Sequence, residues 1–452
     1  MILENDSVQL LDAALKKLAE GFASLPELFA PAAKKNEMAA VMQEVAVRLH
    51  DNYPYFHPQY AGQMLKPPHP IARAAYALAT WINPNNHALD GGRASSQMEK
   101  ESVAQIAAMF GWKEYLGHLC GGGTMANLEA LWVAGQTSPG KKILASDQAH
   151  YTHSRITSVL GLPFAAVPSD SRGRMDVNAL AKMLEAGNAG CVVATTGTSG
   201  AGSVDPLPEI LKLRERHGFR LHVDAAYGGY FTLAANLSSE TRAAFDCITQ
   251  ADSIVIDPHK HGLQPYGCGC VLFRDPGVGA MYQHDSPYTY FSSKELHLGE
   301  ISLECSRPGA SAVALWATMR LLPLVRGGEF ARMLEDCREA ALHLHRRLTQ
   351  DSRWLVPFAP ELDTVVWAPR AKSAMQISAL SQRVFDASAS LGLHFALARM
   401  PARFFCSAQN AFERDQDAVL CLRSVLMKPE HREWLDRLWG ILIRAANEVW
   451  ES

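Results

Sequence analysis

Lys260 stands where a lysine side chain can act as a nucleophile. It follows the short β-prone run at residues 253–256 and the pair Asp257-Pro258. This pattern predicts a buried strand with Lys260 on the loop at its carboxyl end. A lysine whose pKa is lowered in such a setting can attack a carbonyl carbon and form a Schiff base. Considered alone, the residue fits a solvated loop lysine better, because surface lysines are the common case.

Asp224 supplies a second group with matching chemistry, 36 residues before Lys260. It ends another short apolar run, at residues 220–223, and small residues follow it. A pyridoxal phosphate enzyme needs a Schiff-base lysine and a carboxylate that keeps the pyridine nitrogen protonated. A strand-end aspartate is often only a turn residue. However, the carboxyl ends of neighbouring strands form the ligand-binding edge of an α/β sheet, so the pair favours a cofactor site.

Length, composition and charge limit the class of protein. The chain has 452 residues, more than one hydrophobic core usually holds, with 48% hydrophobic and 20% charged residues. The net charge of −3 and the lack of a Lys/Arg block argue against a nucleic-acid or anionic membrane surface. No secretory signal or membrane-spanning run is visible, so we expect a cytoplasmic protein. The nine cysteines show no paired metal-ligand spacing, so we expect no metal site.

The chain alternates between strand and helix patterns before residue 280. Such alternation predicts an α/β fold with a mainly parallel sheet and helices on both faces. Strands are expected at 142–145, 163–167, 191–196, 220–223, 253–256 and 266–273, and helices at 128–136, 176–186, 208–217 and 240–249.

Three parts follow from the pattern along the chain. Helices at residues 8–23 and 38–49 predict an N-terminal helical segment over 1–65. The alternating region predicts a large domain over 66–326. From 327 to 452, long amphipathic helices and short strands predict a small C-terminal α/β domain with an antiparallel sheet.

Two local motifs precede helices. Ser96 and Glu99 have the spacing of a capping box and predict that a helix begins there. Consecutive glycines at residues 121–123 come before a second helix, where backbone N–H groups and the helix dipole can bind an anion. A glycine run is also an ordinary hinge, and this one lacks the residues of a P-loop or a dinucleotide fingerprint.

Three stretches together carry a resemblance to a known family. Residues 257–260 (Asp-Pro-His-Lys), 222–229 (His-Val-Asp-Ala-Ala-Tyr-Gly-Gly) and 146–150 (Ser-Asp-Gln-Ala-His) resemble the signature of the group II pyridoxal-phosphate-dependent amino-acid decarboxylases. The match runs in order from about Tyr55 to Pro308. It implies a fold-type I pyridoxal phosphate enzyme with a seven-stranded type of sheet. The implied reaction removes the α-carboxylate of an L-amino acid to give an amine and CO2.

Two other outcomes stay open for the same residues. A related carbon–carbon lyase or a decarboxylation-dependent aldehyde synthase would also use Lys260 and Asp224. A pyridoxal-binding scaffold would bind the cofactor without turning over an amino acid. Fold alone does not separate these functions.

The resemblance assigns a role to each matching residue. Lys260 would form the Schiff base and Asp224 would face the pyridine nitrogen, with His150 and Ala226 on the two ring faces. His153 does not fall on the motif. The remaining cofactor-binding and substrate positions implied by the resemblance are Gly123 and Thr124 at the phosphate, Thr198 near the substrate carboxylate, and His259 beside the lysine.

Further expectations concern specificity, protonation and assembly. The aromatic loop near residue 55 matches a pocket-lining region of the family, which makes Tyr55, His57 and Tyr60 candidate substrate-binding residues. A tyrosine on a loop after the catalytic lysine delivers a proton in this family, and Tyr288 and Tyr290 are the candidates here, with Tyr288 preferred. The resemblance also implies a homodimer whose active sites lie near the subunit interface, with the N-terminal segment wrapped around the partner.

Overall fold

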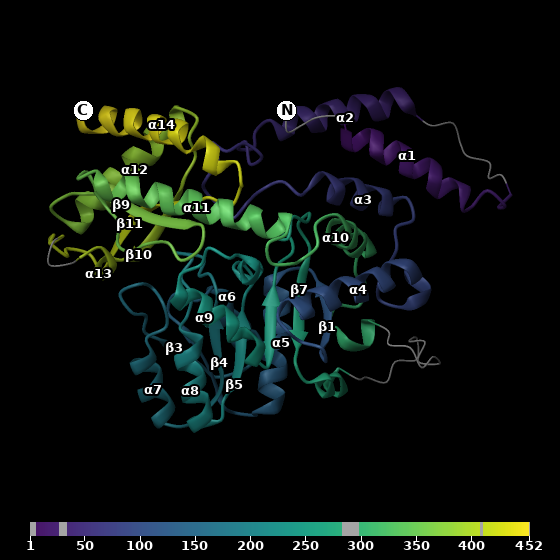
Figure 1. The fold of residues 1–452 in the computed structure, drawn as a ribbon, viewed down its shortest axis with the longest axis horizontal. Helices are drawn as coiled ribbons and strands as arrows, with labels where there is room; N and C mark the ends of the chain where they lie inside the picture. The colour runs from purple at the N-terminus through teal and green to yellow at the C-terminus, as the bar shows by residue number, and fades with distance from the viewer. Residues whose placement is uncertain (1–5, 27–33, 283–297, 407–409, 452) are drawn as a thin grey trace.

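The computed structural model describes residues 6–26, 34–282, 298–406 and 410–451. Two sheets organise these residues (Figure 1). A seven-stranded sheet forms the centre of the larger part of the molecule, and a four-stranded sheet lies in the part that contains the C-terminus. The expected boundary near residue 326 lies between α10 (Gly309–Leu321) and α11 (Glu329–Gln350).

The large sheet has the strand order β1-β7-β6-β5-β4-β2-β3. Strands β3, β2, β4, β5 and β6 pair in parallel, whereas β7 is antiparallel to both of its neighbours. The sheet is therefore mainly parallel, and the predicted α/β class is confirmed. The strands are β1 (Leu116–Cys120), β2 (Lys142–Ser146), β3 (Phe164–Val167), β4 (Ala189–Thr195), β5 (Arg220–Asp224), β6 (Ser253–Ile256) and β7 (Gly269–Phe273).

Burial on both faces explains why the central strands are so apolar. Every residue of β6 and β7 is buried, and β4 and β5 are buried except at their first residues. Helices therefore cover the sheet on both sides, as parallel sheets require. The helices of this part are α3 (Pro70–Thr80), α4 (Arg93–Met109), α5 (Gly123–Thr137), α6 (Thr152–Val159), α7 (Val177–Glu185), α8 (Leu207–His217), α9 (Ser239–Asp246) and α10.

Local capping explains where several of these helices begin and end. The carboxylate of Asp176 accepts hydrogen bonds from two backbone N–H groups of α7, and the hydroxyl of Ser238 accepts one at the start of α9. Gly218 ends α8 with a φ of 67°, a conformation that glycine adopts without strain. These short helices then lead into the strands β5 and β6 that carry the candidate site.

Two features differ from the sequence prediction. Residues 116–120 form strand β1, although Gly117 and His118 interrupt its apolar pattern. The capping box predicted at Ser96 is wrong, because α4 already begins at Arg93. Instead, the carboxylate of Glu99 is buried and forms a salt bridge with Arg307 at 2.8 Å.

The small C-terminal part is an antiparallel sheet of order β10-β11-β9-β8 with helices packed against it. Apolar residues from α11, α12 and α14 form one core cluster with strands β9 and β11. Figure 1 shows these helices gathered above the sheet. The elements are β8 (Trp354–Leu355), β9 (Thr364–Pro369), α12 (Ala374–Ser390), β10 (Ala396–Pro401), α13 (Ala402–Phe405), β11 (Ala418–Val425) and α14 (His431–Glu451).

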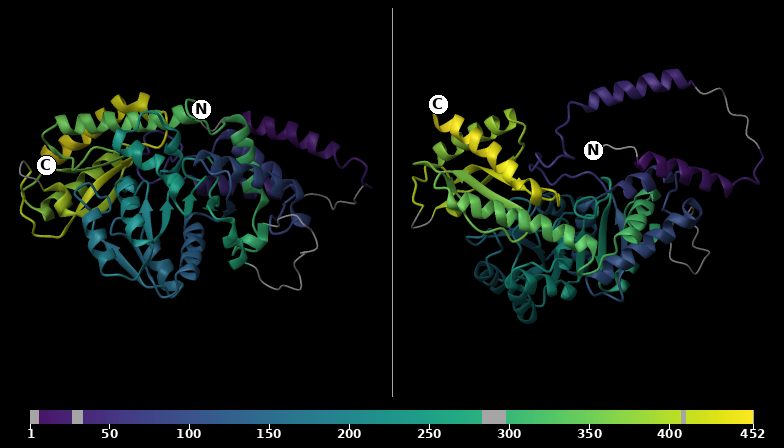
Figure 2. Two further views of the ribbon diagram at one scale, coloured as in Figure 1. Left: turned by 60° about the horizontal axis from the view of Figure 1, so that its bottom comes forward. Right: turned by 45° about the horizontal axis from the view of Figure 1, so that its top comes forward.

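The N-terminal helices α1 (Asp6–Glu20) and α2 (Lys35–Leu49) differ from the rest of the chain in their burial. No residue of α2 is buried within the described chain. Figure 2 shows α2 standing away from both sheets. Within the described residues, no helix has both the length and the apolar character needed to span a membrane.

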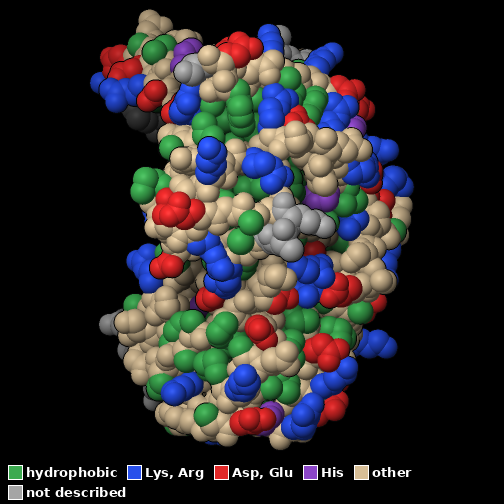
Figure 3. All heavy atoms as spheres, turned by 90° about the vertical axis from the view of Figure 1, so that its left-hand side faces the viewer, with side chains coloured by type: hydrophobic (Ala, Val, Ile, Leu, Met, Phe, Trp, Pro, Cys, Tyr) green, Lys and Arg blue, Asp and Glu red, His purple; other side chains and the backbone are tan. Residues whose placement is uncertain are grey.

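Lysine and arginine side chains are interspersed with acidic ones on the face shown in Figure 3. That face therefore presents no continuous basic surface of the kind that binds nucleic acid.

Candidate active site

A cavity of about 530 Å³ opens at the carboxyl ends of β4, β5 and β6. This is the edge at which ligands of open α/β sheets bind. Its size falls within the range of about 300–1,000 Å³ that is usual for small-molecule and cofactor sites. Its wall contains Gly121, Gly122, Gly123, Thr124, Met125, Asn127, Leu128, His150, Thr152, Thr195, Gly197, Ser199, Asp224, Ala226, Tyr227, Asp257, His259, Lys260, Tyr266 and Gly267.

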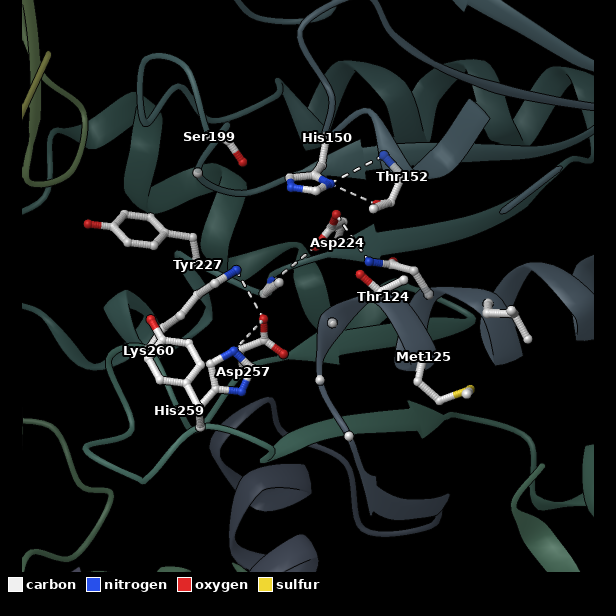
Figure 4. Close-up of a pocket in the computed structure, with 18 of the residues that line it drawn as sticks. Thr124, Met125, His150, Thr152, Ser199, Asp224, Tyr227, Asp257, His259 and Lys260 are labelled. Carbon is white, nitrogen blue, oxygen red and sulfur yellow. Dashed lines mark hydrogen bonds and ion pairs between the residues drawn. The ribbon is translucent and has the colours of Figure 1, made fainter. Parts of the chain in front are cut away.

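Lys260 reaches this cavity from the loop after β6. Its Nζ lies 3.0 Å from Oδ2 of Asp257, and its side chain is 20% exposed while that of Asp257 is almost fully buried. His259 is anchored beside them, because its Nδ1 donates to the carbonyl oxygen of Cys268 at 2.8 Å. Burial lowers the pKa of His259, although the charge of Asp257 opposes this shift. In Figure 4, Lys260, Asp257 and His259 form one group on one side of the cavity.

Asp224 projects into the same cavity from the end of β5, and three groups hold its carboxylate. Nε2 of His153 lies 2.9 Å from Oδ2, and Nδ2 of Asn127 lies 3.4 Å from the same oxygen. The backbone N–H of Ala226 donates to Oδ1 at 3.1 Å. Burial alone would raise the pKa of Asp224, but the hydrogen bond and charge of His153 and the charge of Lys260 outweigh it. The net pKa is lowered, so the carboxylate stays ionised.

Asn127 is itself oriented by a buried histidine. Nε2 of His222 lies 2.8 Å from Oδ1 of Asn127, and Nδ1 of His222 lies 2.9 Å from Oγ of Ser253. Because an amide oxygen only accepts, we assign the proton of His222 to Nε2. Burial lowers the pKa of His222 to about 3, which keeps this ring neutral. A hydrogen-bonded chain thus runs from Ser253 through His222 and Asn127 to Asp224.

His150 lies in the cavity wall, across the view from the lysine group in Figure 4. Its Nδ1 lies 2.8 Å from Oγ1 of Thr152 and also accepts a hydrogen bond from the backbone N–H of that residue. Since Nδ1 accepts from the backbone, the ring proton of the neutral form sits on Nε2. Burial lowers the pKa of His150, while Asp224 opposes the shift.

The glycine run and the first turn of α5 form another part of the wall. Gly122 has a φ of 147°, which side-chain-bearing residues rarely adopt. A Cβ on Gly123 would lie 2.8 Å from Oδ2 of Asp257, so a larger residue would displace that carboxylate. The backbone N–H groups at the start of α5 therefore reach the cavity together with the side chain of Thr124.

The structure separates Thr195, the last residue of β4, from Thr198 in the loop that follows. Thr198 is buried and its Oγ1 accepts from the backbone N–H of Ser203 at 3.0 Å, so its hydroxyl stabilises the loop. Thr198 is not among the residues of the cavity wall, whereas Thr195 is. Oγ1 of Thr195 is buried and has no hydrogen-bond partner among the described residues. Thr195 is therefore better placed than Thr198 to meet a ligand.

Of the three aromatic residues expected in the substrate pocket, His57 and Tyr60 contact the small domain. None of the three is part of the cavity wall. The His57 ring packs edge-to-face on Trp434 of α14, with ring centroids 4.7 Å apart. Tyr60 is buried, packs on Tyr55, and accepts a hydrogen bond at its carbonyl oxygen from Nζ of Lys428. Tyr288 and Tyr290 lie outside the described residues.

Several wall and support residues carry no sequence signal strong enough to predict them. His153 contacts Asp224 across 71 residues of sequence, and Asn127 does so across 97. Only the strand-and-helix alternation could have indicated that α5, α6 and β5 meet at one edge. Tyr266 enters the wall because the predicted strand over residues 266–273 begins only at Gly269.

The cavity fits pyridoxal phosphate. It offers an amine at Lys260, an ionised carboxylate at Asp224 and a helix N-terminus for a phosphate group. Two of its polar atoms, Oδ1 of Asp257 and Oγ1 of Thr195, are buried without a partner among the described residues. Fold and site thus define a pyridoxal phosphate enzyme of fold type I.

Comparison with known proteins places the chain more closely. The family model described as "Pyridoxal-dependent decarboxylase conserved domain" matches residues 139–369, which make up just over half of the chain. The chain belongs to this family, as its motifs predicted.

Individual relatives and structures agree with this assignment. An L-tyrosine decarboxylase of Enterococcus faecium is 28% identical, over 82% of this chain and 78% of that protein. A probable L-tyrosine/L-aspartate decarboxylase of Methanospirillum hungatei is 30% identical, over 67% of this chain and 80% of that protein. The structure of Oryza sativa TDC with PLP and tryptamine matches with a TM-score of 0.78 at 18% identity, covering 99% of both chains. The protein is a pyridoxal-phosphate-dependent amino-acid decarboxylase.

Proposed function

We propose that the protein removes the α-carboxylate of an L-amino acid, with release of an amine and CO2, and that Lys260 holds the cofactor through a Schiff base at Nζ. The observation that carries this proposal is the placement of Lys260 and Asp224 in the wall of one cavity. When bound, pyridoxal phosphate supplies an electron sink for the pair that remains at Cα after CO2 leaves.

Asp224 keeps that sink effective. Its ionised carboxylate would accept a hydrogen bond from the protonated pyridine nitrogen, and a buried charge of this kind is a strong acceptor. His153 and Asn127 hold the carboxylate from behind. The backbone N–H of Ala226 fixes its second oxygen, so the carboxylate is oriented before any ligand arrives.

Asp257 positions the lysine. The salt bridge of 3.0 Å holds Nζ of Lys260 in the wall, beside the start of α5. Asp257 would thereby hold the amine where it can meet the cofactor aldehyde. Gly123, Thr124 and His259 then line the side of the cavity that would bind the cofactor phosphate.

His150 and Ala226 would bound the cofactor ring on its two faces. His150 carries its Nε2 proton in the wall, where it can donate to the substrate carboxylate or to the reacting centre. Thr195 replaces Thr198 as the hydroxyl that we propose for ligand contact, because only Thr195 reaches the wall.

A buried arginine lies behind the wall, next to Ser199. The guanidinium of Arg423, on β11, donates to the carbonyl oxygen of Ser199 and to Oε1 of Gln63, both at 2.6 Å. Arg423 is buried, and its Nε has no partner among the described residues. Relatives of the chain are named for L-tyrosine and L-aspartate. Arg423 is not part of the cavity wall and gives its N–H groups to Ser199 and Gln63, so L-aspartate and L-tyrosine are both candidates for the assay.

We also propose that the protein is a homodimer. Helix α2 exposes an apolar stripe at helical spacing, formed by Met38, Val41, Met42, Val45 and Leu49. An exposed stripe of this length is unusual on a monomer and fits a contact with a second subunit. Sedimentation should then give about twice the chain mass of 49.5 kDa, whereas a single-chain mass would contradict the dimer.

The reaction is tested by supplying purified, cofactor-loaded protein with each common L-amino acid, L-aspartate and L-tyrosine included. Release of CO2 and of the matching amine in equal amounts supports the proposal. An aldehyde with ammonia in place of the amine would identify an aldehyde synthase. Absence of CO2 with every amino acid, from protein that holds the cofactor, would overturn the proposed reaction.

A further inference from the structure

A three-residue segment of the small domain inserts between the loops that form the cofactor cavity. It consists of Glu361, Leu362 and Asp363 and lies between β8 and β9. Leu362 and Asp363 are fully buried, and Glu361 is 7% exposed. The segment therefore belongs to the interior of the molecule, although it connects two strands.

Asp363 contacts two loops of the large domain at once. The hydroxyl of Tyr227 donates to Oδ1 of Asp363 at 2.6 Å. Nε2 of His261 lies 3.0 Å from Oδ2 of Asp363. Tyr227 lies three residues after Asp224, and His261 directly follows Lys260. A single carboxylate thus joins the loop that carries the pyridine-facing aspartate to the loop that carries the lysine.

The other two residues of the segment also reach the third loop, which follows β4. A Cβ at Gly197, in the loop after β4, would lie 3.0 Å from Cδ1 of Leu362. A Cβ at Gly228, in the loop after β5, would lie 2.9 Å from the same atom. The lack of a side chain at both positions therefore leaves room for Leu362. Oε2 of Glu361 accepts from the backbone N–H of Val204 at 2.6 Å. The segment therefore contacts the loops after β4, β5 and β6, which all contribute to the cavity wall.

Asp363 remains ionised in this buried place. Burial would raise its pKa, but the proximity of His261 and the hydrogen bond from Tyr227 outweigh it, so the pKa is lowered. Hydrogen bonds to an ionised acceptor are about twice as strong as neutral ones. Figure 4 shows the Tyr227 hydroxyl directed away from Asp224, so this group serves the contact with Asp363 and leaves the cavity centre to other residues.

We propose that Asp363 is a positioning residue through which the small domain sets the affinity of the cavity for pyridoxal phosphate. Asp363 does not touch the cavity itself. It acts by fixing Tyr227 and His261, and through them the spacing of Asp224 and Lys260. Cofactor affinity depends on this spacing because a site displaced by about 1 Å loses much of its binding energy. This inference rests on the proposed use of Lys260 and Asp224.

The test measures the dissociation constant of pyridoxal phosphate by titration of the full-length apoprotein. Asp363→Asn keeps the side-chain shape and removes the charge, and it should weaken binding at least tenfold. Tyr227→Phe removes a single hydroxyl and should weaken binding about threefold or more. Both changes break the same contact. The dissociation constant of the double variant should therefore be at most about twofold higher than that of Asp363→Asn alone.

Glu129→Gln is the matched control. Glu129 is as buried as Asp363 and also faces a histidine, with Oε2 2.9 Å from Nε2 of His118. It is not part of the cavity wall, so its replacement should change the dissociation constant less than threefold.

The outcomes separate cleanly. Unchanged binding in both Asp363→Asn and Tyr227→Phe would overturn the inference, as would equal weakening by Asp363→Asn and Glu129→Gln. If Asp363→Asn does not fold, the result for Tyr227→Phe decides alone. If the wild-type protein fails to bind the cofactor, the proposed function falls and not only the role of Asp363.

Discussion

Nε2 of His153 lies 2.9 Å from Oδ2 of Asp224, and both side chains are buried. The same oxygen accepts a hydrogen bond from Nδ2 of Asn127, whose Oδ1 lies in turn 2.8 Å from Nε2 of His222. The carboxylate at the end of β5 is therefore held in one orientation and in its ionised form. This arrangement suits a group that must keep a ring nitrogen protonated throughout a reaction.

Replacing His153 should impair the enzyme even though this residue does not reach the cavity wall. His153→Phe removes the hydrogen bond to Asp224, and a hydrogen bond to a charged group contributes about 1.5–3 kcal/mol. We expect turnover to fall by roughly tenfold or more. His153→Gln retains an N–H donor and should recover part of the loss. Equal rates for His153→Phe and the wild type in a CO2-release assay would contradict this role.

Asp224→Asn keeps the shape of the side chain and removes its charge. Without that charge the pyridine nitrogen loses its proton, and a transition-state interaction of about 2.7 kcal/mol is lost, equivalent to about a hundredfold in rate. Turnover should fall at least that much while the circular dichroism spectrum stays unchanged. A folded Asp224→Asn protein with the wild-type rate would exclude the proposed role of Asp224.

His222 should make stability depend on pH. Burial lowers its pKa to about 3 from an ordinary value near 6.5. Between these values the unfolded chain binds a proton at His222 that the folded chain does not bind. The free energy of unfolding therefore falls as the pH drops from about 6.5 toward 3, by at most ~1.4 kcal/mol per pH unit for this group.

Urea denaturation of His222→Gln at several pH values checks this effect. The variant should be less stable than the wild type at pH 8, because contacts to Asn127 and Ser253 are weakened. Its stability should nevertheless decline less steeply between pH 6 and pH 5. Parallel declines for the two proteins would show that His222 does not cause the pH dependence.

Sequence alone could predict the parts of the site that follow continuous patterns. Asp224 ends one short apolar run and Lys260 lies four residues after another, so the strand before each of them and its sheet edge were predictable. His153 was not, because its contact with Asp224 depends on how α6 packs and no local pattern encodes that. The substrate role of Tyr60 stays a prediction, and the packing of its loop against the small domain could not be predicted because an aromatic loop can pack on either domain. Strand β1 was not predicted because its apolar pattern is interrupted by His118, which is buried and pairs with Glu129 of α5.

The loop tyrosines remain a prediction from sequence. If Tyr288 donates the proton to Cα, Tyr288→Phe should bind the cofactor normally, form amine more slowly and release a larger fraction of carbonyl product. The same assay on Tyr290→Phe is the control. Changes in Tyr290→Phe but not in Tyr288→Phe would reverse the assignment, and no change in either would leave His150 as the next candidate donor.

The central claim is that Nζ of Lys260 holds the cofactor. Borohydride reduction of the cofactor-loaded protein, followed by proteolysis and mass spectrometry, tests it most directly, because reduction fixes the cofactor to the lysine that carries it. We expect the added phosphopyridoxyl mass on the peptide that contains Lys260. The same mass on a different lysine, or on none, would contradict the proposed site.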